Sequence, residues 1–84
     1  MRYGLSVVAS ARRELRAIPK DCYPAIRDAI SALRTQPRPP GTVKLTGSTD
    51  YRVRVGDYRI IYRIDDARQI VTILGVGHRR DVYR

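Results

Sequence analysis

The sequence predicts an α+β fold in the order β-α-α-β-β-β, a mostly antiparallel sheet with a two-helix hairpin packed on one face. Two segments that alternate apolar and polar residues meet at Gly56-Asp57, and a third segment, over 69–76, is almost continuously apolar. The front half of the chain instead shows the apolar spacing of helices. No linker-like stretch interrupts the 84 residues, so residues 1–84 are expected to form a single domain.

The front half predicts one strand and two helices. Residues 2–8 alternate weakly and indicate an opening strand. A first helix is expected to begin after Ser10, as N-cap, and to end at Pro19. A second is expected over 21–35, with Asp21 as its N-cap. Its apolar residues recur at the three- and four-residue steps of one helical face: Ala25, Ile26, Ala29, Ile30 and Leu33.

The back half predicts strands. A Pro-rich loop over 37–41 ends the second helix, and an extended piece over 42–45 follows it. The segment over 69–76 is apolar enough to be a central strand that is covered on much of both faces. A short basic tail over 77–84 follows.

The most informative segment is the hairpin over 51–64. A two-residue Gly56-Asp57 turn would place Arg54 opposite Arg59. One face would then collect Tyr51, Val53, Val55, Tyr58, Ile60, Tyr62 and Ile64. The other would collect Arg52, Arg54, Arg59 and Arg63. Because like charges directly opposite on a sheet cost up to ~1 kcal/mol, an anion is expected between Arg54 and Arg59.

The charge of the chain indicates an acidic partner. The net charge is +9 with 17 Lys and Arg residues, of which only Lys20 and Lys44 are lysines. Arginine forms the bidentate contacts that suit phosphate. A nucleic acid and an acidic protein both remain candidates, and a general bias of composition toward arginine would give the same count.

The sequence lacks the patterns of several classes of protein and of functional site. No apolar run approaches the ~18 residues of a membrane span, and the N-terminal segment lacks a signal-peptide pattern, so a cytoplasmic protein is expected. One cysteine, Cys22, excludes an intramolecular disulfide and a metal cluster. No phosphate-binding glycine loop, zinc spacing, Ser-His-Asp set or carboxylate pair is found, so no metal and no cofactor are expected.

The remaining candidates for functional residues are arginine, histidine and tyrosine side chains. The tail contains His78, Arg79, Arg80 and Tyr83, and its two arginines directly follow the histidine. Guanidinium groups on a concave sheet could hold a scissile phosphate, and a ring could stack on an unpaired base. RNA supplies its own 2′-hydroxyl nucleophile, so metal-free cleavage requires only positioning and proton transfer. His78 is the one ready proton acceptor, although a surface histidine without a role is the plainer interpretation.

Three segments of the back half resemble the RelE/ParE superfamily of bacterial and archaeal toxins, and its RelE branch most. They are Lys44-Leu45-Thr46-Gly47, the hairpin from Tyr51 to Tyr62 with its Tyr-Arg-Val-Arg-Val-Gly-Asp-Tyr-Arg run, and Gly77-His78-Arg79-Arg80-Asp81-Val82-Tyr83. The resemblance implies a RelE-like α+β fold and a toxin that cleaves mRNA in the ribosomal A site without a metal.

The resemblance also implies roles for residues. Arg59 and Arg79 match arginines that stabilise the phosphate, and Tyr83 matches a tyrosine that orients or stacks on the substrate. Arg52 and Arg54 occupy positions that are commonly lysine. A lysine at position 54 is a proposed general base, a role that arginine fills poorly, so either His78 takes the proton or Arg54 acts only electrostatically. Lys44, Arg52 and Arg80 are expected to bind substrate.

The partners implied are mRNA, the ribosome and a cognate acidic, RelB-like antitoxin, with DNA reached only through the antitoxin complex. Two alternatives stay open: a ParE-like inhibitor of DNA gyrase, and a non-catalytic toxin that serves mainly as a repressor subunit with its antitoxin.

Overall fold

The computed structural model describes residues 2–78. Its elements in chain order are β1 (Gly4–Val7), α1 (Ala9–Arg16), α2 (Tyr23–Ala32), β2 (Val43–Lys44), β3 (Asp50–Val55), β4 (Tyr58–Asp65) and β5 (Ile70–His78).

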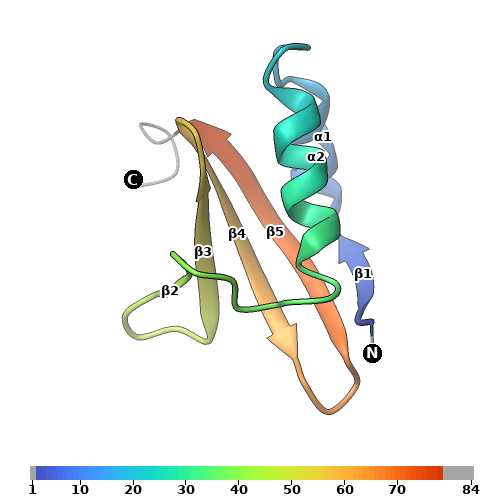
Figure 1. Cartoon of the computed structure of the whole chain (residues 1–84), viewed down its shortest axis with the longest axis vertical. Coiled ribbons are helices and arrows are strands. Elements are labelled where there is room, and N and C mark those ends of the chain that lie inside the picture. The colour runs from blue at the N-terminus through green and yellow to red at the C-terminus, as the bar shows by residue number, and fades with distance from the viewer. Residues whose placement is uncertain (1, 79–84) are drawn as a thin grey trace.

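The strands form one five-stranded sheet in the order β1-β5-β4-β3-β2, and both helices lie on one face of it (Figure 1). β1 pairs parallel with β5, whereas the other neighbours are antiparallel. The predicted α+β class and the mostly antiparallel sheet are confirmed. The parallel pairing of β1 is an addition that the sequence pattern does not predict.

The core lies between the helices and this face of the sheet. Its buried apolar residues are Ala11, Ile26, Ile30, Leu33, Val53, Ile60, Tyr62, Val71, Ile73 and Val76. Every predicted apolar member of the hairpin face is either in this set or packs against it. Burying each large apolar side chain is worth about 1.5–3 kcal/mol, so this face fixes which side of the hairpin turns toward the helices.

The start of α1 differs from the prediction. The N-cap is Val8, in extended conformation, and no side chain caps the helix, so Ser10 lies inside the first turn. The backbone N–H of Val8 donates to the carbonyl of Ile73 (3.1 Å), and this bond holds the chain in the sheet until the helix begins. The predicted Ser10 cap is therefore wrong.

α2 also starts later than predicted. Cys22 rather than Asp21 occupies the N-cap position, and a proline, Pro24, falls in the first turn, where its missing N–H costs least. The helix ends at Ala32, and the following residues form a turn closed by hydrogen bonds to backbone carbonyls of the last turn.

The hairpin has the predicted register, with Arg54 opposite Arg59 and Val55 opposite Tyr58. The turn glycine, Gly56, has φ of +59°, while Asp57 is not among the residues with positive φ. That combination is the type II′ turn, which suits the twist of a tight hairpin. The Gly-Asp turn thus sets the pairing of every later residue in β3 and β4.

A polar cluster ties the loop after α2 to the far end of the sheet. The Tyr62 hydroxyl donates to the carbonyl of Pro37 (2.7 Å). Asp66 accepts from Arg38 (2.9 Å) and from the Tyr3 hydroxyl (2.7 Å). The hydrogen bond from Arg38, and then that from Tyr3, holds the pKa of Asp66 below its ordinary value. Burial raises the pKa of Tyr62.

Candidate functional site

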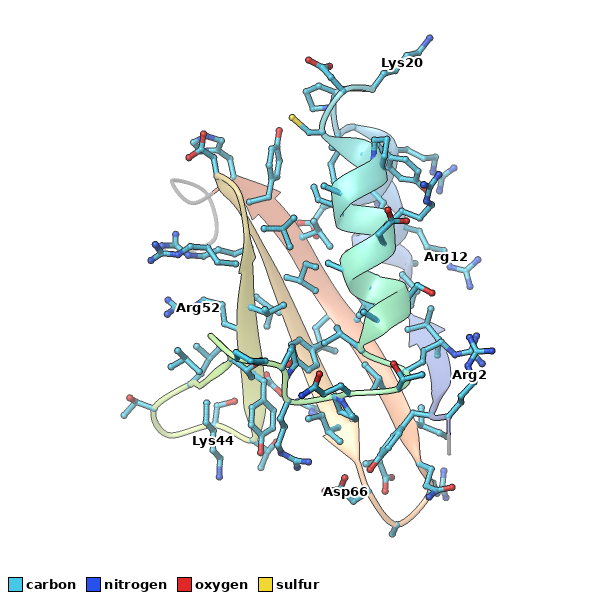
Figure 2. The ribbon with its side chains drawn as sticks, in the orientation of Figure 1. Arg2, Arg12, Lys20, Lys44, Arg52 and Asp66 are labelled. Carbon is cyan, nitrogen blue, oxygen red and sulfur yellow. The ribbon has the colours of Figure 1, made fainter. Side chains whose placement is uncertain are left out.

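The sheet face opposite the helices, here the outer face, carries the arginines of the hairpin. Residues paired across the sheet share a face, so Arg54, Arg59 and Gly77 form one row. Arg52, Ile61 and Gly75 form the next row. Asp50, Arg63 and Thr72 form the third. Figure 2 shows labelled Arg52 projecting from the sheet on the side away from the helices.

Arg54 and Arg59 form the arginine pair of this face. They are directly opposite in register, so their Cβ atoms are about 4.5–5.5 Å apart. Arg54 is exposed, whereas Arg59 is only 6% exposed. Arg59 is therefore buried, although its register places it on the face of the sheet that the helices do not cover. Charges interact more strongly where burial lowers the local dielectric constant, so an anion at this pair would interact more strongly with Arg59 than with exposed Arg54.

Arg63, at the other end of the outer face, is engaged within the protein. Its Nε donates to Asp50 Oδ1 across the strands (2.9 Å), and the Asp50 side chain is 20% exposed. Arg63 is therefore held by a carboxylate of its own sheet. In the register of the hairpin, Arg52 lies opposite Ile61, and Arg54 lies opposite Arg59.

His78 does not join the arginine pair. Register places it opposite Tyr58, on the helix-facing side, while the outer-face neighbour of Arg59 is Gly77. The His78 and Tyr58 rings meet edge to face, with centroids 5.6 Å apart. The expectation that an imidazole sits among the arginines is corrected by this register, because adjacent residues of a strand point to opposite faces.

Lys44 is separated from the arginines for the same reason. It pairs with Tyr51, whose side chain packs against the core, whereas Val43 is the residue paired with Arg52. The structure thus brings together Arg52, Arg54 and Arg59 but not Lys44 or His78. The remaining predicted residues, Arg79, Arg80 and Tyr83, lie outside the described residues.

A hollow of about 310 Å³ opens beside the arginine pair. Its lining is Glu14, Asp50, Ile61, Leu74, Gly75, Val76 and Gly77. The register between β4 and β5 shifts after Ile61, so Leu74 and Gly75 occupy the space of one residue. Such bulges bend the strand and occur often next to active sites. Sequence reasoning missed both the bulge and Glu14, which lies far from the hairpin in the chain.

The chemistry of the outer face is that of its guanidinium groups. Within residues 2–78, no group of three or more His, Cys, Asp and Glu could hold a metal ion. None of the described helices is long and apolar enough to cross a membrane. The outer face can bind an anion through guanidinium groups and stabilise negative charge that builds on it.

Comparisons with known proteins place this geometry in a family. A family model described as the ParE toxin of type II toxin–antitoxin systems matches residues 6–83. Toxin RelG from Mycobacterium tuberculosis is 36% identical over 88 residues, which cover 100% of this chain and 99% of the relative.

Two solved structures give the same answer. A chain of the RelBE2 toxin–antitoxin complex from Mycobacterium tuberculosis has a TM-score of 0.82 at 31% identity, covering 93% of this chain and 99% of that one. A chain of the archaeal RelE–RelB complex from Pyrococcus horikoshii has a TM-score of 0.84 at 28% identity, covering 96% and 99%. This chain therefore belongs to the RelE/ParE superfamily and is a RelE-like toxin of a type II toxin–antitoxin system.

Proposed function

We propose that this toxin is a metal-free endoribonuclease that cleaves mRNA in the ribosomal A site. The observation that carries the proposal is the register of Arg54 opposite Arg59 on the outer face. Like charges directly opposite on a sheet face repel one another, and a phosphodiester bound by both arginines would offset the repulsion with charge-assisted contacts.

In this mechanism the outer face positions the RNA and stabilises charge. Arg54 and Arg59 would hold the non-bridging oxygens of the scissile phosphate as the 2′-oxygen bonds to phosphorus and the bond from phosphorus to the 5′-oxygen breaks. The 2′-hydroxyl proton would pass to solvent, and solvent would protonate the leaving 5′-oxygen. Arg52, in the next row, would hold a neighbouring phosphate. Arg79, Arg80 and Tyr83 are proposed to complete the site, the tyrosine by stacking on a base. His78 is not assigned as the base, because it lies on the other face.

The partners proposed are the ribosome and an acidic antitoxin. A net charge of +9 favours docking on ribosomal RNA, with affinity that falls steeply as salt rises. Solved relatives include complexes of toxin with antitoxin, such as the RelE–RelB complex from Pyrococcus horikoshii. A RelB-like acidic chain that covers the outer face would neutralise this toxin by masking its arginines.

The test is cleavage of mRNA by purified toxin on programmed ribosomes. The Arg54→Gln variant is expected to lose cleavage by at least tenfold, since one charge-assisted contact to the transition state is worth on the order of 1.5–3 kcal/mol. The matched control is Arg13→Gln, which removes the same charge from exposed α1. Cleavage that falls equally in both variants, or in neither, would refute the outer face as the site.

A second candidate, inhibition of DNA gyrase, is favoured by one observation, the match to the ParE family model. Induced cells distinguish the two activities. Broken mRNA with normal plasmid supercoiling supports the ribonuclease, and intact mRNA with altered supercoiling supports the gyrase inhibitor.

A further inference from the structure

Glu14 reaches the hollow on the outer face from the end of α1. Its Oε1 accepts a hydrogen bond from the backbone N–H of Val76 (3.0 Å). The last β5 residue in the β1 pairing is Ile73, opposite Val7, so within residues 2–78 no strand pairs with this edge of β5 at Val76. Glu14 satisfies the exposed donor of that edge, and this bond fixes where its carboxylate lies.

The floor of the hollow is open backbone. Gly75 and Gly77 are the outer-face residues of β5 there, and glycine inside a strand often marks a close approach of a ligand. A Cβ built on Gly75 would lie 3.5 Å from Glu14 Oε1, an ordinary contact distance, so a side chain would fit at that position. The glycine therefore leaves free space beside a fixed carboxylate, with Ile61 and Leu74 as apolar walls.

The position of the hollow relates it to the arginine pair. Gly77 is the register partner of Arg59 on the neighbouring strand, about 4.8 Å across the sheet, and Gly75 lies two residues back along β5, a further step of about 6.6 Å. Gly75 is therefore about 8 Å from the backbone of Arg59, a distance of the order that separates the base of a nucleotide from its phosphate. A phosphate at the arginine pair would thus place its own base over Gly75.

The chemistry of Glu14 selects among bases. A carboxylate only accepts hydrogen bonds, and the bond to Val76 uses Oε1 and leaves acceptor capacity on Oε2. Adenine, cytosine and guanine each carry an exocyclic amino group that can donate to it. Uracil presents a single ring N–H between two carbonyl oxygens, which the carboxylate repels.

We propose that the hollow is a base-binding subsite in which Glu14 accepts from an amino group of an unpaired mRNA base and disfavours uracil. The inference rests on the proposed ribonuclease function. It adds a residue from α1 that sets sequence preference without contacting the scissile phosphate.

The experiment maps cleavage ends on ribosomes programmed with all four bases at each A-site position. Wild-type toxin should cleave least when uracil occupies one fixed position relative to the cut. The glutamine of Glu14→Gln can keep the bond to Val76 through its amide oxygen, while its NH₂ group now donates a hydrogen bond toward the base. Cleavage at codons with uracil at that position should therefore rise roughly tenfold relative to cleavage at codons with cytosine there. Glu14→Ala should remove the preference, and Thr72→Val, on the outer face outside the hollow lining, should leave it unchanged.

Two results would overturn the inference while the ribonuclease stands: wild-type cleavage with no base preference at any fixed position, and a Glu14→Gln variant that loses cleavage equally at every codon. The second would assign Glu14 to folding or to proton transfer, and a thermal unfolding curve of the same sample separates those two roles. A wild-type toxin that cleaves nothing on ribosomes overturns the proposed function, and this subsite with it.

Discussion

Replacing Arg54 with glutamine should stabilise the folded toxin while it removes activity. Arg54 faces Arg59 across the hairpin and is itself exposed. Two unit charges about 7 Å apart repel by about 0.6 kcal/mol in water, within the range of up to ~1 kcal/mol for opposed like charges on a sheet. A gain of this size raises the melting temperature of a domain this small by about 2–5 °C.

The assay is thermal and urea unfolding of the wild type and of two matched variants. Arg63→Gln removes the same charge from the same face, but Arg63 bonds Asp50 at 2.9 Å. The Arg63→Gln variant should lose about 0.2–1 kcal/mol of its free energy of unfolding, the range for a partly exposed ion pair. The two substitutions therefore have opposite expected signs, and both effects should shrink as added salt screens the charges.

Sulfate tests the same pair of arginines independently. An anion that binds between Arg54 and Arg59 stabilises the wild type by mass action and should stabilise Arg54→Gln much less. The proposed repulsion between Arg54 and Arg59 is refuted if Arg54→Gln and Arg63→Gln shift stability in the same direction, or if sulfate raises the melting temperatures of the wild type and Arg54→Gln equally.

Three further substitutions test the fold that presents the outer face. Tyr62→Phe should cost about 1 kcal/mol in urea unfolding, because it deletes the bond to the Pro37 carbonyl; an unchanged midpoint would contradict this. Ile26→Ala, at a fully buried position, should cost about 2–5 kcal/mol; a loss below 1 kcal/mol would mean that α2 is loosely packed. The pKa of Asp66 is lowered in the folded state. The ionised carboxylate therefore stabilises the folded protein at neutral pH, and this stabilisation is lost as pH falls below about 4. Asp66→Asn should therefore lose less stability on acidification than the wild type, whereas parallel pH curves would refute the role of Asp66.

The hairpin could be predicted residue by residue because its information is local. A two-residue turn leaves only one register, and a one-residue slip would have moved Val53 and Ile60 to the outer face. Because side chains alternate between the two faces of a strand, the apolar residues of the hairpin show which face meets the core. The same alternation predicts that Arg52, Arg54 and Arg59 share the other face.

The rest of the site depends on pairings that no short segment encodes. The register of β4 with β5 is set by a longer connection and a bulge at Leu74-Gly75. The Gly-Asp turn therefore does not predict on which face of the sheet His78 lies. The contact of Glu14 with Val76 arises because β1 pairs parallel with β5 and stops at Val7. Neither the parallel pairing nor its end is visible in the alternation of residues 2–8.

Photo-crosslinking from two exposed apolar positions tests most directly whether mRNA lies on the outer face. Val43 is 44% exposed and is the register partner of Arg52, whereas Tyr23 is 39% exposed at the start of α2. Each would be replaced by a benzoyl-phenylalanine in toxin bound to programmed ribosomes. We expect crosslinks to A-site mRNA from position 43 and none from position 23. Crosslinks to mRNA from position 23 alone would place the substrate on the helical side and contradict the proposed site on the outer face.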